Sequence, residues 1–138
     1  MRGYSRLGQH GACWLALGAA GVAIDRPSRS RWRRATLRVG ASYAANQAVK
    51  LAVRRRRPQL RDLPPLISTP TQLSFPSAHA ATSIAALRAF EGLLPLPPLR
   101  LAALTMAWSR LYLGVHYPSD IVAGMLLGAA IGKLGDTR

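Results

Sequence analysis

The residues best suited to chemistry in this sequence are a histidine and a carboxylate placed around a proline, with an arginine before them. His116 and Asp120 lie on either side of Pro118. Pro118 fits the first position of a helix, which places Asp120 in the first turn and His116 just before it. A carboxylate near one imidazole nitrogen fixes the tautomer and leaves the other nitrogen able to attack. Arg110, which follows Ser109, adds a planar charged fork that matches phosphate oxygens.

A second group, Pro76-Ser77-Ala78-His79, comes directly before an apolar run. Pro76 and Ser77 fit a helix start, where the first backbone N–H groups have no partner in the helix and the helix dipole favours an anion. His79 would then lie within the first turn, beside any anion bound there.

A third group is Lys50, followed by six residues and then Arg57 and Pro58. Lys50 falls at the end of an apolar segment and Arg57 just beyond it, so both can direct positive charge at one pocket. The run Arg54 to Arg56 between them is interpreted as solvated or facing lipid headgroups. These three groups together predict a phosphate-binding site.

The elements that must position these groups are apolar segments rich in Ala, Gly and Leu. They cover residues 11–24, 35–53, 78–94, 99–113 and 121–134. Because strands favour β-branched and aromatic residues instead, we expect helices. The basic stretch 25–34 and the proline-rich stretch 58–76 are expected to be loops. The sequence therefore predicts an all-α bundle of about five helices, as one domain over residues 1–138.

Two features of the sequence point in opposite directions on whether the bundle crosses a membrane. Small residues permit close helix packing in lipid, and polar residues in apolar helices commonly face the bundle interior. No uncharged run, however, reaches the roughly 20 residues of a spanning helix. We expect a multi-pass protein of the cell membrane. The alternative is a soluble helical domain whose first apolar segment is a signal peptide preceded by Arg2 and Arg6. Basic residues divide equally between the two ends, so the positive-inside rule does not decide orientation.

The composition argues against several function classes. The 138 residues include 19 Lys and Arg against 5 Asp and Glu, for a net charge of +14, yet 49% are hydrophobic. Basic nucleic-acid binders and disordered tails are commonly poor in apolar residues, and 7% aromatic residues argue against a single-strand stacking platform. The single cysteine, Cys13, excludes an internal disulfide framework and a Cys-based zinc site. We therefore expect no nucleic-acid partner.

Together the three groups resemble the signature of the type 2 phosphatidic acid phosphatase (PAP2) family, which shares its site with vanadium haloperoxidases. The matching motifs are Lys50-x6-Arg57-Pro58, Pro76-Ser77-Ala78-His79 and Ser109-Arg110-x5-His116-x3-Asp120. Within the family, this chain is similar in size to the small bacterial polyprenyl-phosphate phosphatases, including those that act on decaprenylphosphoryl phosphoribose.

The resemblance implies hydrolysis of a phosphomonoester or diphosphate on a polyprenyl or glycerolipid carrier, with no metal or other cofactor. His116, oriented by Asp120, would attack phosphorus to form a phosphohistidine. His79 would protonate the leaving oxygen and then activate water. The groups that would neutralise the phosphate oxygens are Lys50, Arg57, Arg110, the Ser77 hydroxyl and the Ala78 amide.

Two departures from the family pattern stand out. Ala78 replaces the usual glycine, which is tolerated where φ is negative, as at a helix start. Membrane members commonly have six spanning helices, whereas five segments are expected here.

Three other functions remain open. A non-enzymatic cationic membrane protein that binds anionic lipid would account for the arginine runs but not for His79 and His116. A haloperoxidase would hold vanadate in the same pocket, although that class resembles longer, soluble proteins. A nucleic-acid binder would account for the basic charge alone.

Overall fold

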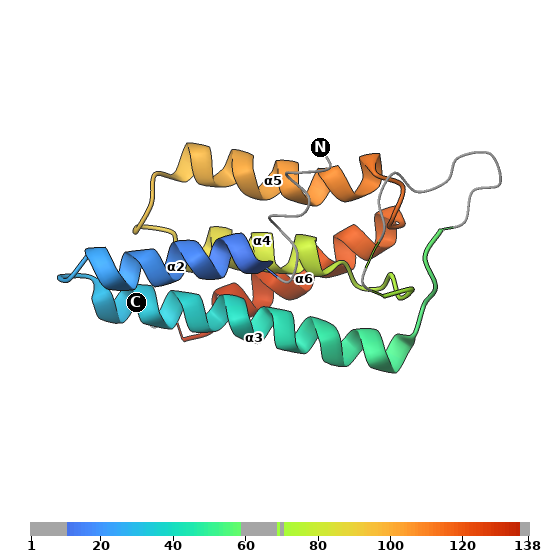
Figure 1. Cartoon of the computed structure of the whole chain (residues 1–138), viewed down its shortest axis with the longest axis horizontal. Coiled ribbons are helices and arrows are strands. Elements are labelled where there is room, and N and C mark those ends of the chain that lie inside the picture. Colours follow the sequence, from blue (N-terminus) through green and yellow to red (C-terminus); the bar gives the residue numbers. More distant parts are fainter. Residues whose placement is uncertain (1–10, 59–68, 70, 136–138) are drawn as a thin grey trace.

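The computed structural model describes residues 11–58, 69 and 71–135, which form five helices (Figure 1). These are α2 (Ala12–Ile24), α3 (Arg29–Val53), α4 (Ala78–Ala89), α5 (Leu96–Tyr112) and α6 (Pro118–Gly132). The predicted all-α fold is confirmed. The interpretations placed on Arg2, Arg6 and on most of the proline-rich stretch lie outside the described residues.

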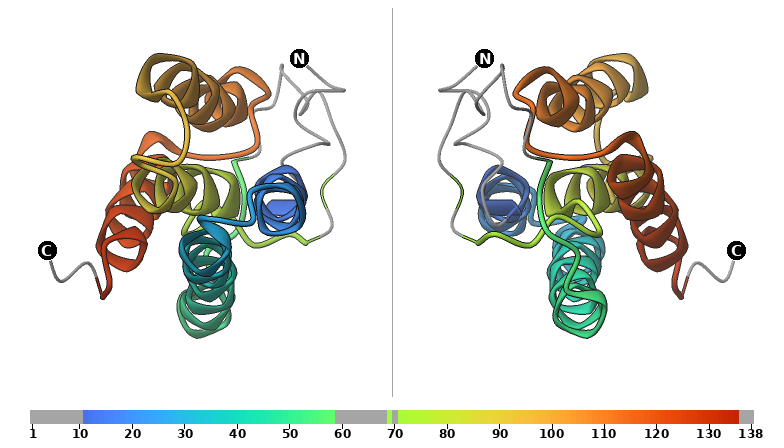
Figure 2. Two further views of the ribbon diagram at one scale, coloured as in Figure 1. Left: turned by 90° about the vertical axis from the view of Figure 1, so that its left-hand side faces the viewer. Right: turned by 90° about the vertical axis from the view of Figure 1, so that its right-hand side faces the viewer.

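Helix α4 occupies the centre of the bundle, and the other four helices surround it (Figure 2). Most of its residues are buried, as expected for a short helix rich in alanine. Helix α6 approaches it most closely through three glycines. A Cβ atom added at Gly124 would lie 2.5 Å from the Ser77 carbonyl oxygen, and one at Gly128 or Gly132 would meet the Ala81 or Ala85 carbonyl oxygen. Only glycine lets the two backbones approach this closely.

Two tryptophans connect the first helices to this centre. Trp14 of α2 donates from Nε1 to the Ser83 hydroxyl of α4 at 3.0 Å. Trp32 of α3 packs against Phe90, just after α4, with ring centroids 5.4 Å apart. The first apolar segment is therefore packed into the bundle.

Helix boundaries differ from the sequence prediction at three places. Helix α4 ends at Ala89 rather than at residue 94. Helix α3 begins at Arg29 rather than at residue 35, so the basic stretch is mostly helical. Arginine is a good helix former, and the turn before it is short: the Asp25 carboxylate accepts a hydrogen bond from the Ser28 amide at 3.2 Å. Helix α5 begins at Leu96 and includes Pro97 and Pro98 in its first turn, where no N–H is needed.

Helix α3 is the longest helix, with 25 residues, but its first turns carry several arginines. The other four have 17 residues or fewer. Among the helices in the described part of the chain, none combines the length and apolar character needed to cross a membrane.

Four helix ends meet at one end of the bundle, on the right in Figure 1. Helices α3 and α5 end there, whereas α4 and α6 begin there. This convergence places the last turns of two helices beside the first turns of two others.

Candidate active site

The converging helix ends carry all three groups of polar residues identified in the sequence. The buried members are Lys50, Ser77, His79, Arg110, His116 and Asp120, while Arg57 and Ala78 are half-buried. Burial of so many polar and charged side chains is costly unless they are paired or await a ligand. The structure thus brings together residues that are 70 positions apart in the chain.

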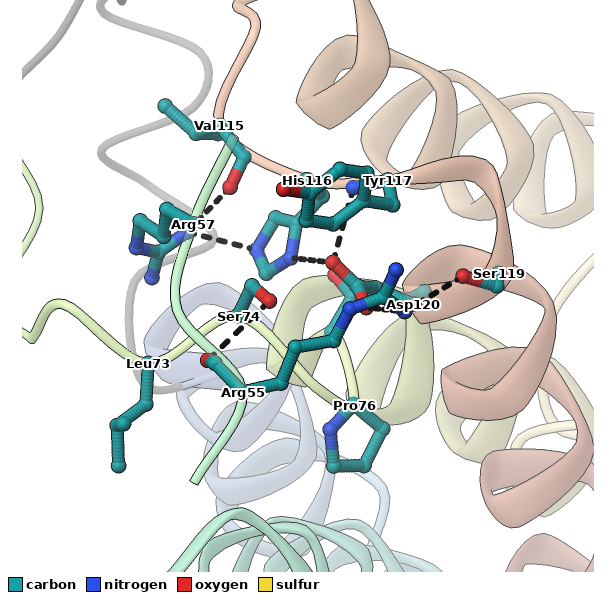
Figure 3. A network of polar contacts seen from close by, with 12 residues as sticks. Arg55, Arg57, Leu73, Ser74, Pro76, Val115, His116, Tyr117, Ser119 and Asp120 are labelled. Carbon is teal, nitrogen blue, oxygen red and sulfur yellow. Dashed lines mark hydrogen bonds and ion pairs between the residues drawn. The ribbon is translucent and has the colours of Figure 1, made fainter. Parts of the chain in front are cut away.

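His116 and Asp120 lie as the sequence predicted, on either side of the α6 start. Pro118 is the first residue of α6. The Asp120 carboxylate accepts a hydrogen bond from the Tyr117 amide at 2.9 Å through Oδ2. The same oxygen lies 3.4 Å from Nδ1 of His116, a contact too long or poorly aligned for a well-formed hydrogen bond (Figure 3). The turn geometry therefore directs one face of the carboxylate at the imidazole.

Arg57 contacts the other nitrogen of the same imidazole. Its Nη1 atom lies 3.1 Å from Nε2 of His116 and donates to the Val115 carbonyl at 2.7 Å. A guanidinium can only donate, so Nε2 must be the acceptor and Nδ1 must carry the proton. This assigns the tautomer: Nδ1–H faces Asp120, and the Nε2 lone pair faces Arg57.

The surroundings keep this imidazole neutral. Burial lowers the pKa of the His116 imidazole to about 4, although the Asp120 carboxylate acts in the opposite direction. The positive charges of Arg57, Arg110 and Lys50 contribute to this lowering of the pKa. Since only the neutral form has a lone pair on Nε2, the site holds His116 in the form that can act as a nucleophile.

The start of α4 is built as the sequence predicted. Ser77 caps the helix, and its hydroxyl accepts from the Ala80 amide at 3.4 Å. The Ser77 amide itself donates to the Asp120 backbone carbonyl at 2.9 Å, which joins the α4 start to the first turn of α6. Ala78 is the first helical residue, and within the described residues Arg54 is the non-glycine residue with a positive φ. Ala78 therefore needs no glycine-specific conformation.

Lys50 connects the third group of residues to the second. Its Nζ atom donates to the Pro76 carbonyl at 2.9 Å and lies 3.4 Å from the Leu73 carbonyl. Asn46, one turn earlier and fully buried, donates to the same Pro76 carbonyl at 3.2 Å. The last turns of α3 thereby hold the residue that precedes the α4 cap.

Comparison with known proteins matches residues 32–135 to the PAP2 superfamily. The chain belongs to this family. Decaprenylphosphoryl-5-phosphoribose phosphatase of Mycolicibacterium smegmatis is 44% identical over 127 residues, which cover 89% of this chain and 68% of that protein. The protein of the same name from Mycobacterium tuberculosis is 42% identical over 139 residues, which cover 99% and 77%.

A solved structure shares the fold of this PAP2 chain. The transmembrane PAP2-type phosphatidylglycerolphosphate phosphatase of Bacillus subtilis superposes with a TM-score of 0.76 at 24% identity. The alignment covers all of this chain and 78% of that one. The family match and the two mycobacterial relatives confirm the resemblance drawn from the three motifs and make the chain a PAP2-type phosphatase.

Sequence reasoning missed one residue of the PAP2 site. Arg55, interpreted as part of a solvated run, donates from Nη1 to Asp120 Oδ1 at 3.2 Å and to the Ser119 hydroxyl at 2.8 Å. After α3 the chain is extended, with a bridge between Arg56 and Leu73. Alternate residues of an extended segment point to opposite sides, so Arg55 shares the side of Arg57. That spacing of two residues was the available signal.

Donors for a metal ion are few in this PAP2 site. His79, His116 and Asp120 supply its imidazole and carboxylate groups. Within the residues that the structure describes, no group of three or more His, Cys, Asp or Glu side chains is arranged to hold a metal. The expectation of catalysis without a metal stays a prediction.

Proposed function

We propose that this PAP2 phosphatase hydrolyses a phosphate ester at the end of a polyprenyl-linked lipid, through a phosphohistidine intermediate. The observation that carries the proposal is the His116 ring, held between Asp120 and Arg57 with its nucleophilic nitrogen toward a cluster of cations. The substrate class follows from the two mycobacterial relatives, which are named for a decaprenyl-linked phosphoribose phosphate.

In the first step, Nε2 of His116 attacks phosphorus and the bond to the lipid oxygen breaks. His79 gives its proton to that oxygen, so the lipid leaves as an alcohol. The Nδ1 proton faces Asp120, whose negative charge stabilises the imidazolium character of the phosphohistidine. In the second step, His79 takes a proton from water, which attacks phosphorus and releases inorganic phosphate and neutral His116.

Fixed positive charge stabilises the phosphoryl group in both steps. Lys50, Arg57 and Arg110 neutralise the equatorial oxygens, and the Ser77 hydroxyl and Ala78 amide add hydrogen bonds at the α4 start. These groups supply the charge that a metal ion supplies in many phosphoryl-transfer enzymes. The reaction then needs no cofactor.

We further propose that the chain is a multi-pass protein of the cell membrane. Large apolar side chains lie exposed on several helices, which suits contact with lipid tails. The exposed side chains are Ile24, Leu37, Leu51, Val53, Leu101, Leu104, Trp108, Tyr112, Val122, Leu126 and Leu134. The B. subtilis protein that shares the fold is described as transmembrane.

The test measures phosphate release by protein purified in detergent, from decaprenyl phosphate, decaprenyl diphosphate, decaprenylphosphoryl phosphoribose and phosphatidic acid. Each substrate is assayed with and without EDTA. His116→Ala is the inactive variant, and Arg56→Gln, an exposed residue of the same region, is the matched control.

We expect release from at least one polyprenyl substrate, unchanged by EDTA, absent in His116→Ala and retained in Arg56→Gln. Quenching with alkaline SDS after brief mixing with ³²P-labelled substrate should give a base-stable, acid-labile label on His116. Activity abolished by EDTA would overturn the metal-free reaction. Lipid binding that survives in His116→Ala, with no phosphate release by the wild type, would favour the cationic lipid-binding alternative.

A further inference from the structure

We propose that Arg55 is a positioning residue, which holds the Asp120 carboxylate in the orientation that directs His116. The inference rests on the proposed function of His116 as nucleophile. It starts from a run of four arginines, Arg54 to Arg57, that composition alone would assign to solvent.

The backbone separates this run into two pairs. Arg54 ends α3 in the left-handed conformation, with φ of 54°, and the chain then runs extended alongside residues 72–74. The Arg57 amide donates to the Gln72 carbonyl at 3.0 Å, and the Ser74 amide to the Arg55 carbonyl at 2.7 Å. Arg54 and Arg56 are exposed, whereas Arg55 and Arg57 are half-buried.

The two half-buried arginines contact opposite sides of the pair formed by His116 and Asp120. Arg57 contacts Nε2 of His116, whereas Arg55 contacts Oδ1 of Asp120 at 3.2 Å. The other carboxylate oxygen, Oδ2, is taken by the Tyr117 amide and by Nδ1 of His116. Both oxygens of Asp120 therefore have partners, and the carboxylate cannot rotate without breaking one of them (Figure 3).

Arg55 is itself fixed in place. Its guanidinium carbon lies 4.1 Å from the centre of the Tyr117 ring, a cation–π contact. The same Nη1 atom donates to the Ser119 hydroxyl at 2.8 Å. Its side chain is 40% exposed, while that of Asp120 is fully buried. Losing a charged partner is costly for a buried carboxylate, even when that partner is partly solvated.

A residue that acts through Asp120 should affect the chemical step rather than substrate binding. Arg55→Gln should lower kcat roughly 10–100-fold, the effect of one charge-assisted hydrogen bond to a buried group, with KM little changed. Arg55→Lys keeps the charge and one donor and should recover most of kcat. Arg56→Gln, one residue away and exposed, should match the wild type.

The decisive measurement is a double-mutant cycle with Asp120→Asn, using p-nitrophenyl phosphate so that the lipid tail plays no part. If Arg55 acts through Asp120, the double variant should be no slower than Asp120→Asn alone. Additive losses, or a higher KM at unchanged kcat, would overturn the proposal and make Arg55 a substrate contact. Thermal unfolding of each variant in detergent checks folding, and Arg55→Met, which also removes the charge, takes the place of Arg55→Gln in the cycle if Arg55→Gln does not fold.

His116→Ala is assayed in parallel to separate this proposal from the proposed function. Phosphate release that persists in His116→Ala would overturn the proposed nucleophile. Loss of release in His116→Ala together with additive losses at Arg55 and Asp120 would overturn only the role of Arg55.

Discussion

The Nη1 atom of Arg57 lies 3.1 Å from Nε2 of His116, so the guanidinium that we propose to bind phosphate covers the nitrogen that we propose as the nucleophile. Attack on phosphorus requires the Nε2 lone pair. Arg57 must therefore exchange this contact for a phosphate oxygen when a substrate enters. The arrangement orders the imidazole before the substrate arrives and keeps its lone pair from other electrophiles.

Removal of Arg57 should expose His116 to small electrophiles while abolishing most catalysis. In Arg57→Ala, carbethoxylation of His116 by diethyl pyrocarbonate should be faster than in the wild type, because Nε2 loses its donor. Inorganic phosphate should slow the reaction in the wild type by occupying the site. Mass spectrometry of the peptide that contains His116 measures the rate. A slower reaction in Arg57→Ala would contradict the shielding role.

Protonation of His116 should occur well below the ordinary histidine range. Its pKa is lowered to about 4, so the neutral, nucleophilic form persists as the pH falls through 6.5, and is lost only as the pH approaches 4. NMR titration of ¹⁵N-histidine-labelled protein from pH 8 to pH 4 should show this, with His116→Ala assigning the signal. Titration of His116 with a midpoint between pH 6 and pH 7 would contradict the burial argument.

His79→Ala should separate the two chemical steps. With p-nitrophenyl phosphate, the phenolate leaves without a proton, so the first step should continue and the second should slow. Rapid mixing should therefore show a burst of about one p-nitrophenol per active site, followed by turnover reduced roughly 10²–10⁴-fold. A polyprenyl phosphate needs protonation and should show no burst. Equal loss of both phases with both substrates would argue against His79 as the acid.

The close contact of α4 and α6 should make Gly128 intolerant of even a methyl group. A Cβ there would meet the Ala81 carbonyl oxygen, whereas a Cβ at Gly40 of α3 has nothing within 4 Å. Gly128→Ala should destabilise the fold by about 1–3 kcal/mol through overpacking. Gly40→Ala should be neutral or stabilise by about 0.5–1 kcal/mol, because alanine is the better helix former. Unfolding in mild detergent compares the two variants, and equal stabilities would contradict the packing argument.

Sequence rules for helix starts were sufficient to predict how a large part of the candidate site is positioned. Pro118 and Ser77 each marked a helix start correctly, because the orphan N–H groups of a first turn restrict which residues can stand there. The placement of Asp120 and His79 in those turns followed directly. The extent of α3 did not follow, since arginines in a basic stretch fit a loop or a helix equally well by composition.

Arg55 was missed for a different reason. Its side-chain direction depends on the conformation of Arg54, which ends α3 with a positive φ and turns the chain into an extended segment. No propensity rule predicts a left-handed arginine, and the extended segment that follows it pairs with residues 72–74 through Arg55 and Arg57. The partner of that pairing lies in another part of the sequence, so only the three-dimensional structure could show which arginines face Asp120.

The hydrogen bonds from Lys50 to the Pro76 and Leu73 carbonyls have a thermodynamic consequence. A lysine side chain that is already ordered loses little conformational entropy when an anion arrives. The Lys50 side chain is ordered when the protein folds, so more of its electrostatic attraction to the anion contributes to binding affinity. The same anchoring prevents this ammonium from following a phosphate to a new position. We therefore expect Lys50 to select substrates by the position of the phosphoryl group and not by the length or shape of the chain attached to it.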